Sequence, residues 1–473
     1  MTPTRREGRC IWLREAIAPG ETDAEPLRGE NRTDVAIVGG GYAGLWTALE
    51  IKSRDPACGV AIIEADICGG GASGRNSGMV LSQWAKLDAL RAFCGEDGAV
   101  RLGHAFAQSA ANIDAFCREN HIDAEYRPDG WVWGSTCAAH DESWSGILAS
   151  LSRSGLEPFQ VISSAEIAAR CGTTSFRGGI YDPGAATLHP GKLVRGIRRV
   201  ALARGVRIFE NSPMRRLQQN VPAVVETATG RMTARTVILT MNAWSLMFPV
   251  LRSAIFVIAS DDAVTAPIPE LLEKVGYLRK PLMGDSQTFV TGFRTTADHR
   301  FQPGISGGII GFGSIEGQRF EGRSTRDEAI RASVERGFPE LAHVPFTDSW
   351  CGPIDRTRSG LPLFGRLPGS PHILYGYGFS GNGVATTPVT ARILASLALD
   401  QKDEWSTCGL VRPPDRWLPP EPFRYIGAHL VRGAVRHKDR MEQSGRRPRA
   451  AARLLAQLAP GGITTSTVKA QGD

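Results

Sequence analysis

The chain has 473 residues, of which 42% are hydrophobic, enough for two or three domains with a large core. The formal net charge is +7, but residues 424–453 alone hold nine Lys/Arg and two Asp/Glu, so the remainder is about neutral. This distribution excludes a basic nucleic-acid groove in the body of the protein. The nine cysteines form no C-x-x-C pair and the nine histidines show no metal-ligand spacing, which predicts reduced thiols in the cytoplasm and no metal site.

Neither the N-terminal segment nor the most apolar stretch has the composition of a targeting or membrane element. Residues 1–32 contain several arginines but no apolar core of a signal peptide, so we expect an irregular leader that Trp12 packs onto the body. Residues 237–258 contain Asn242, Pro249 and Arg252, which is not the composition of a membrane span. The sequence therefore predicts no membrane span.

The segment 34–64 has the order strand, glycine turn, helix, strand and acid. An apolar run at 35–38 predicts a buried parallel strand, and the glycines at 39–44 fit G-x-G-x-x-G. A helical stretch and a second apolar run, 60–63, follow, and the segment ends on Glu64. This order is typical of a dinucleotide site, whereas the glycine motif alone would fit many α/β proteins.

Each part of this fingerprint has a physical role. Gly39 permits the tight turn after the strand, Gly41 lets backbone approach a pyrophosphate, and Gly44 lets the helix pack closely. The helix N-terminus offers free N–H groups and a partial positive charge to phosphates. Glu64 can accept hydrogen bonds from a ribose, and its charge would repel a 2′-phosphate, which disfavours NADP.

A second glycine-rich segment, residues 69–78, follows directly. It combines five glycines with Ser73, Arg75, Asn76 and Ser77. Such a composition suggests backbone that runs close to a ligand, with donors for a phosphate or a ring edge. The alternative is a flexible surface loop.

The central part of the chain alternates between helical and strand patterns. A lone histidine, His189, precedes a helix and is expected to cap or pack it. Predicted helices span 88–120, 144–151, 164–170, 191–204 and 325–334, and predicted strands span 126–133, 180–182, 206–210, 221–226, 235–240, 254–259, 288–293 and 305–312.

A third glycine-rich segment lies near the C-terminus. Residues 361–365 are expected to turn, 372–375 to form a strand, and the glycine loop 376–383 to lead into a helix that ends near residue 399. Two strand–glycine–helix units more than 300 residues apart favour one long ligand held at its phosphates and at its far end. FAD has that shape, and NAD would not obviously need the second unit. Beyond residue 400, an amphipathic helix is predicted at 423–443.

These blocks resemble the FAD-dependent D-amino-acid oxidase superfamily, and within it the branch of glycine oxidase, sarcosine oxidase and γ-glutamylputrescine oxidase. The resemblance covers about residues 10–400 and lies in VAIVGGGYAGLWTALE, GASGRNSG, TMNAWS, WCGPIDRTRSGLPLFG and YGYGFSGNG. It implies an α/β (α+β) fold, in which a Rossmann-like FAD-binding domain (GR2-type) is interleaved with a mixed β-sheet substrate domain.

The resemblance also implies domain boundaries. The predicted units are a leader (1–32), a discontinuous FAD-binding domain (33–110, 190–250 and 345–400), a substrate domain (111–189 and 251–344), a basic C-terminal extension (401–460) and a disordered tail (461–473).

The resemblance further implies the cofactor-binding residues, which lie in five groups along the chain. The pyrophosphate, ribose, flavin-side, adenine and flavin-edge contacts are Gly39, Gly41, Tyr42, Ala43, Gly44, Glu64, Ala65, Gly71, Ala72, Ser73, Arg75, Asn76, Ser77, Met214, Asn242, Trp244, Gly378, Ser380, Gly381, Asn382 and Gly383. Arg356, Arg358 and Tyr377 are candidate substrate contacts, and the catalytic residues stay unassigned.

Several positions depart from these relatives. Ala385 stands where sarcosine-oxidase relatives carry a lysine that helps to hold the substrate carboxylate, and Arg75 stands where some relatives attach flavin to histidine. Cys351 lies one position before the cysteine that carries flavin in monomeric sarcosine oxidase, so a thioether is an alternative to the non-covalent FAD that we expect. The loop also ends in TRSG in place of TPDG.

The implied activity is oxidation of a C–N bond in an amine or amino acid. A hydride passes from the α-carbon to flavin N5, the imine hydrolyses to a carbonyl compound, and O₂ or another acceptor reoxidises the flavin. The alternatives are an NAD-dependent dehydrogenase and a non-catalytic flavoprotein subunit that docks through the basic segment after Arg424. The substrate and the oligomeric state stay open.

Overall fold

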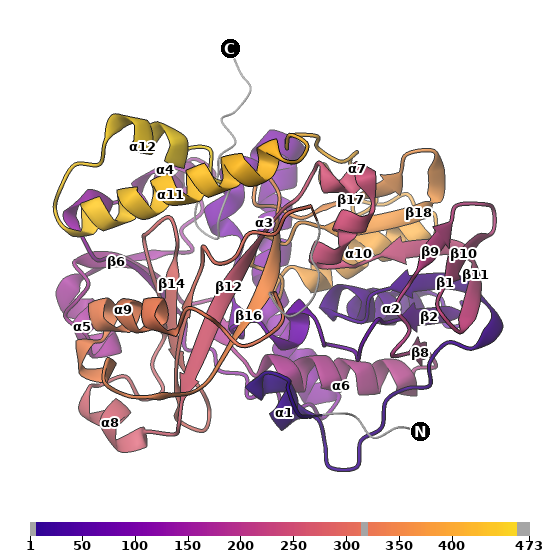
Figure 1. Cartoon of the computed structure of the whole chain (residues 1–473), viewed down its shortest axis with the longest axis horizontal. Helices are drawn as coiled ribbons and strands as arrows, with labels where there is room; N and C mark the ends of the chain where they lie inside the picture. Colours follow the sequence, from indigo (N-terminus) through magenta and orange to yellow (C-terminus); the bar gives the residue numbers. More distant parts are fainter. Residues whose placement is uncertain (1–5, 314–319, 461–473) are drawn as a thin grey trace.

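The computed structural model describes residues 6–313 and 320–460, which form two eight-stranded sheets and one two-stranded ribbon. Figure 1 shows the first sheet at the right and the second at the left. Helices α11 (Phe423–Gln443) and α12 (Ala450–Ala456) run along the upper edge. This arrangement confirms the predicted α/β (α+β) class with a Rossmann-like half and a mixed sheet. The predicted tail, 461–473, lies outside the described residues.

The first sheet has the order β17-β18-β11-β1-β2-β8, with β10 and β9 attached to β11. The run from β18 to β8 is parallel, and β17 and β10 pair antiparallel with their neighbours. Its strands are β1 (Gly29–Val38), β2 (Val60–Ile63), β8 (Arg207–Phe209), β9 (Arg216–Gln218), β10 (Ala223–Glu226), β11 (Gly230–Leu239), β17 (Leu363–Leu367) and β18 (Ser370–Tyr377).

The carboxyl end of the central strand β1, residues 35–38, is buried on both faces, as its continuous apolar run predicts. Val35 and Ile37 belong to a core cluster shared with the helices α2 (Tyr42–Arg54), α6 (Pro190–Ala203) and α10 (Thr387–Ala398). Ala36 and Val38 belong to a second cluster, shared with β10, β11 and the turn after β11. The carboxyl end of β1, where the glycine turn follows, is therefore fixed from both sides.

The second sheet has the order β16-β12-β15-β14-β13-β4-β6-β5. It is mixed, because β13 and β4 run parallel while the other pairs are antiparallel. Its strands are β4 (Trp131–Ser135), β5 (Gln160–Ser163), β6 (Gly178–Asp182), β12 (Phe256–Thr265), β13 (Leu282–Asp285), β14 (Thr291–Thr295), β15 (Phe301–Ile305) and β16 (Phe346–Arg356), and the separate ribbon pairs β3 (Met79–Val80) with β7 (Ala186–Thr187).

The predicted helices are present at the predicted places. His189 caps α6, since its Nδ1 accepts a hydrogen bond from the Lys192 amide at 3.1 Å. α3 bends at Gly95, whose φ is +67°. The helices are α1 (Ile11–Ala16), α2 (Tyr42–Arg54), α3 (Leu87–Glu119), α4 (Ser145–Ser152), α5 (Ser164–Cys171), α6 (Pro190–Ala203), α7 (Pro249–Arg252), α8 (Pro269–Lys274), α9 (Asp327–Gly337), α10 (Thr387–Ala398), α11 and α12.

The predicted irregular leader is wrong in part. Residues 11–16 form α1, and β1 begins at Gly29, inside the predicted leader. Trp12 packs as expected, because its ring is 1% exposed and lies edge-on to His189 and Trp350 at 5.0 and 5.6 Å. The apolar contacts of one buried helical turn explain why the leader is ordered.

Three predicted segments are also corrected. The strand predicted at 126–133 begins only at Trp131, because Gly130 has a φ of +81°. Residues 305–312, all of which the structure describes, do not form the predicted strand. β15 ends at Ile305, and Gly307 turns the chain with a φ of +77°. The turn predicted at 361–365 overlaps β17, which pairs with β18.

β16 bears on the predicted domain boundaries. It lies in the second sheet, paired with β12 along nearly its whole length, although the prediction assigns residues 345–400 to the FAD-binding domain. The division into domains stays a prediction. Among the residues that the structure describes, no helix has the length and apolar character needed to cross a membrane.

Candidate cofactor and substrate site

The first glycine turn joins the carboxyl end of β1 to α2. Gly39 has a φ of +112°, and a Cβ placed there would lie 2.5 Å from the carbonyl oxygen of Thr240. A Cβ on Gly44 would lie 2.0 Å from the carbonyl oxygen of Gly39. Both positions are confined by backbone, so no side chain can be accommodated without moving the turn.

The second glycine segment docks onto the first. The amide of Tyr42, the first residue of α2, donates to the Ser73 hydroxyl at 2.8 Å, and the Gly69 amide donates to the Gly40 carbonyl at 3.1 Å. Gly41 faces the same hydroxyl, because a Cβ on it would lie 2.9 Å from Ser73 Oγ. The two segments therefore meet at a helix N-terminus, whose partial positive charge suits an anion.

Glu64 lies at the end of β2, beside this turn. Its Oε2 accepts from the Gly40 amide at 2.6 Å and its Oε1 from the Asp66 amide at 2.9 Å. Burial raises the pKa of Glu64 to about 7, although both amides lower it. The carboxylate is thus positioned where the fingerprint predicts a ribose, and Ala65 after it is exposed.

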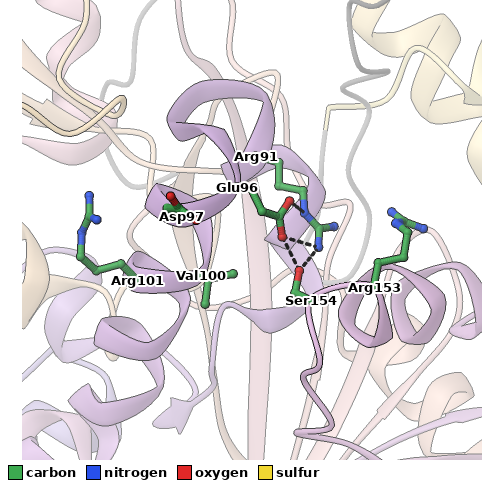
Figure 2. Close-up of a pocket in the computed structure, with 7 residues that line it drawn as sticks. All are labelled: Arg91, Glu96, Asp97, Val100, Arg101, Arg153 and Ser154. Carbon is green, nitrogen blue, oxygen red and sulfur yellow. Dashed lines mark hydrogen bonds and ion pairs between the residues drawn. The ribbon is translucent and has the colours of Figure 1, made fainter.

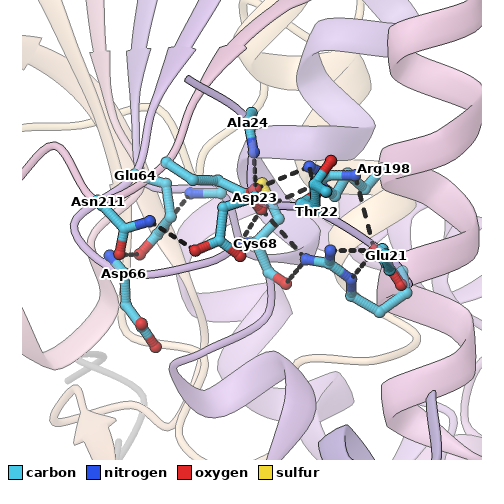
Figure 3. A network of polar contacts seen from close by, with 12 residues as sticks. Glu21, Thr22, Asp23, Ala24, Glu64, Asp66, Cys68, Arg198 and Asn211 are labelled. Carbon is cyan, nitrogen blue, oxygen red and sulfur yellow. Dashed lines mark hydrogen bonds and ion pairs between the residues drawn. The ribbon is translucent and has the colours of Figure 1, made fainter. Parts of the chain in front are cut away.

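A buried ionic network holds the segment that follows Glu64. Glu210 is fully buried and binds the guanidinium groups of Arg195 and Arg198 at 3.1 and 2.7 Å. The same carboxylate accepts from the Cys68 amide at 2.8 Å. Figure 3 shows Glu64 and Asp66 on one side of this network and Arg198 with Glu21 on the other. The network therefore fixes the segment that follows Glu64, the predicted ribose contact.

The segment 69–78 also reaches the second sheet. Ser77 Oγ donates to Asp262 of β12 at 2.7 Å, and the carbonyl of Arg75 accepts from the Trp350 indole at 2.8 Å. Arg75 Nη1 lies 3.4 Å from Glu321. Asn76 is used within the segment, where its amide donates to the carbonyls of residues 72 and 73. The segment thus bridges the two sheets.

Three more predicted cofactor contacts gather near the ends of β2 and β11. Trp244 packs on Gly71, since a Cβ on that glycine would lie 3.4 Å from the indole. Met214 and Trp244 both pack against the core cluster on the same face of β1. Asn242 has a φ of +48°, and its side chain accepts from the next amide.

The C-terminal glycine loop is held by Asp355, which sequence reasoning missed. This residue of β16 is fully buried and accepts from the amides of Gly378 and Phe379, the latter at 3.1 Å. Burial raises its pKa to about 7 against the effect of these amides. Gly352 and Pro353 made the sequence around Asp355 resemble a loop, although these residues belong to β16.

The loop itself presents strained backbone and one unsatisfied acceptor. Ser380 has a φ of +54°, and its hydroxyl accepts from the Thr357 amide at 3.2 Å. Asn382 is 6% exposed, and its Oδ1 has no partner among the described residues. α10 begins at Thr387, after a turn in which the Thr387 amide donates to the Gly383 carbonyl, so the loop leads into a helix as predicted.

The three candidate substrate contacts differ in their exposure. Tyr377 is fully buried in the core beside Tyr375, and its hydroxyl has no hydrogen-bond partner among the described residues. Arg356 is half-buried, whereas Arg358 is exposed. Burial lowers the pKa of Arg356 to about 10, and Asp355 opposes that shift.

A buried lysine beside Arg356 was also missed. Lys86 is 2% exposed and ends the short helix η2 (Trp84–Lys86). Burial, together with the positive charge of Arg356, lowers the pKa of Lys86 to about 7. Its segment touches the C-terminal glycine loop, because the Asn382 amide donates to the Ser82 carbonyl at 3.4 Å. Lysines are rarely buried, so composition alone offers no clue to this residue.

Cys351 is buried in β16, and its pKa is raised to about 11, chiefly by burial. The thiol is therefore protonated at neutral pH and is a poor nucleophile.

A cluster of possible metal ligands forms from residues that are far apart in the sequence. His140, Asp439 and Glu442 lie close together, although the sequence shows no metal-ligand spacing. Lys438 Nζ lies 2.6 Å from Glu442, so a positive charge is already present there.

Two surface hollows lie away from these loops. A hollow of about 720 Å³ is lined by α3 and the end of α4, where Glu96 faces Arg91 and Ser154 (Figure 2). Another of about 510 Å³ lies beside the middle of β1 and β11 and the amino ends of β2 and β8. Neither lining contains a predicted cofactor or substrate contact.

The residues at the loops fit an extended dinucleotide. Gly41 leaves room beside a hydroxyl and a helix N-terminus, and Glu64 offers an acceptor at the end of β2. At the C-terminal glycine loop, the buried Asn382 Oδ1 has no donor among the described residues. A ligand with phosphates in its middle and polar groups at both ends matches these features.

Comparisons with known proteins agree with this geometry. γ-Glutamylputrescine oxidoreductase of Escherichia coli is 28% identical over 373 residues, covering 77% of this chain and 83% of that protein. Glycine oxidase of Geobacillus kaustophilus is 24% identical over 391 residues, covering 78% of this chain and 93% of that protein. Its crystal structure superposes with a TM-score of 0.65 at 19% identity, over 82% of this chain and all of that one.

The sequence also matches a family model described as FAD dependent oxidoreductase over residues 34–397. That description names FAD and not NAD, so the predicted cofactor is confirmed and the NAD-dependent alternative is set aside. Within the matched residues, the structure accounts for the positions of the glycine turn after β1, the acid after β2 and the C-terminal glycine loop. The chain therefore belongs to the FAD-dependent oxidoreductase family and is an enzyme of the D-amino-acid oxidase type.

Proposed function

We propose that this enzyme oxidises a C–N bond in an amine or amino acid. When bound, FAD supplies an acceptor for a hydride from the α-carbon of the substrate. The imine that leaves is hydrolysed by water to a carbonyl compound and ammonia or an amine, and O₂ or another acceptor takes the electrons from the cofactor. The names of the relatives, one acting on γ-glutamylputrescine and one on glycine, support this substrate class.

The observation that carries the proposal is the pair of anchored glycine loops. The N-terminus of α2 would hold the pyrophosphate at Gly39, Gly41 and Gly44, with Glu64 at the ribose. The loop fixed by Asp355 would face the flavin edge that gains negative charge. The protonated Cys351 thiol supports non-covalent FAD.

We further propose that Lys86 and Arg356 hold an anionic group of the substrate. Arg356 lies close enough to lower the pKa of Lys86, which is 2% exposed, and Arg356 itself is half-buried. An anion between them would offset the repulsion and restore the charged form of Lys86. This arrangement would serve where the lysine of sarcosine-oxidase relatives is replaced by Ala385, and Arg358 would contribute from the surface.

An anaerobic absorbance titration tests the proposal. The purified protein is titrated with γ-glutamyl amines, glycine, N-alkyl amino acids and uncharged amines. We expect the long-wavelength flavin band to bleach with an anionic compound and not with its uncharged analogue. Recovery in air would identify O₂ as an acceptor, and recovery only with an artificial acceptor would identify a dehydrogenase. A flavin band that no amine in the panel bleaches would overturn the proposed reaction.

A further inference from the structure

The C-terminal helices and the turn after them carry most of the large apolar side chains that are exposed in the described part of the chain. Of the eleven large hydrophobic residues that are exposed in the described chain, six lie between Phe423 and Leu458. A seventh, Phe312, packs edge-on against Tyr425 of α11 at 5.5 Å. Single exposed apolar residues are ordinary on a protein surface, but such a cluster marks a contact surface. We call the six residues the C-terminal ridge: Phe423, Ile426, Leu430, Leu454, Leu455 and Leu458.

The ridge faces outward by construction. Phe423, Ile426 and Leu430 have the spacing of one helical stripe and are 68%, 54% and 59% exposed. The opposite face of α11 is fixed to the second sheet, since Asp439 accepts from the amides of residues 288 and 289. Arg432 donates to the Gly308 carbonyl at 2.6 Å. α11 therefore cannot turn its apolar stripe inward without losing these buried contacts.

The charges around the ridge have one sign. Residues 423–458 contain two acids, Asp439 and Glu442, and both point inward, the second to His140 Nε2 at 2.9 Å. Five exposed arginines rim the ridge, and none of them has an ion pair within the described part of the chain: Arg440, Arg446, Arg447, Arg449 and Arg453. Figure 1 shows α11 and α12 together along one edge of the molecule.

We propose that the C-terminal ridge holds the enzyme reversibly against a membrane surface rich in anionic phospholipid. Aliphatic and phenylalanine side chains would enter the interface while arginines contact the headgroups, which is the composition of helices that lie in the plane of a bilayer. A second copy of this chain is a poorer partner, because two arginine rims would face each other. The C-terminal segment 461–473 has only Ile463 and Val468 as large aliphatic residues, too few to cover six.

Co-sedimentation of the full-length, FAD-loaded enzyme with vesicles tests the proposal. We expect binding to vesicles of phosphatidylcholine mixed with phosphatidylglycerol, loss of this binding at high salt, and little binding to vesicles of phosphatidylcholine alone. The triple variant Ile426→Ser, Leu430→Ser and Leu454→Ser should abolish binding, and Arg446→Glu should weaken it by about fivefold or more.

The controls use exposed apolar residues elsewhere. Leu202→Ser and Val221→Ser, 40% and 80% exposed in the wild type, should bind vesicles as the wild type does. Thermal unfolding with FAD bound establishes that every variant is folded. The proposal is overturned if wild type ignores anionic vesicles, if the control pair loses binding equally, or if a chain ending at Pro460 loses binding. Concentration-dependent dimers that the triple variant abolishes would assign the ridge to a second copy and also overturn it. The vesicle-binding result does not depend on which reaction the enzyme catalyses.

Discussion

Replacing Asp355 by asparagine isolates the support of the C-terminal glycine loop. The carboxylate accepts from two buried amides, those of Gly378 and Phe379. An asparagine keeps one acceptor and turns an NH₂ group toward the second amide. One buried N–H is then left without an acceptor, which costs about 1–3 kcal/mol.

This cost divides between two measurable quantities. If the loop is equally ordered with and without FAD, the free energy of unfolding of the apoprotein falls by that amount. If FAD orders the loop, the dissociation constant for FAD rises instead, by about 5- to 150-fold. Denaturant unfolding of the apoprotein and quenching of FAD fluorescence on binding measure the two parts, and their sum is the predicted quantity.

The matched control is Asp97→Asn, an exposed carboxylate on α3. The reasoning is refuted if Asp355→Asn leaves both the apoprotein stability and the FAD affinity as close to wild type as the control does. A pH series adds an independent check. Because burial raises the pKa of Asp355 to about 7, the folded chain binds more protons than the unfolded chain between about pH 4 and 7. Stability contributed by this group therefore falls as pH rises through that window, and the variant should lack this contribution.

Gly44, Lys86 and Cys351 each support one further prediction. Gly44→Ala should abolish FAD binding and lower the unfolding midpoint, because its Cβ would meet the Gly39 carbonyl at 2.0 Å, and an FAD-loaded, normally stable variant would contradict the geometry. Lys86→Gln should raise KM for an anionic substrate at least tenfold at pH 6 with little change in kcat; the wild-type KM should rise above about pH 7, as Lys86 loses its proton, while the variant stays flat. Acid denaturation should release all FAD from both wild type and Cys351→Ser, and flavin retained by the wild-type polypeptide would show a thioether.

The parts of the site that sequence predicted are those built from neighbours in the chain. Strand, glycine turn, helix and acid within 34–64 fold as one unit, so Gly39, Gly44 and Glu64 lie where the pattern places them. α11 was also predicted with its observed ends, because amphipathic spacing is a local property. Elements built from neighbouring residues can therefore be predicted from the sequence.

The parts that were missed depend on distant segments. Asp355 is recognisable only when β16 is paired with β12, about a hundred residues earlier, and Pro353 argued against a strand there. Lys86 lies near Arg356, and its segment contacts the C-terminal glycine loop through the Asn382 side chain. The leader is ordered because Trp12 meets His189 and Trp350. None of these contacts leaves a periodic trace in the sequence.

The segment 69–78 is tied at Ser73 to the helix of the first sheet and at Ser77 to β12 of the second. The smallest piece of this chain that can retain FAD is consequently larger than its Rossmann half. A protease cut that separates the sheets would release the cofactor even where each half stays folded, and a transplanted Rossmann half would arrive with its phosphate-side loop held at one end only. For an engineer who wishes to exchange substrate specificities between relatives, the interchangeable part is therefore not a whole sheet but the side chains that line it.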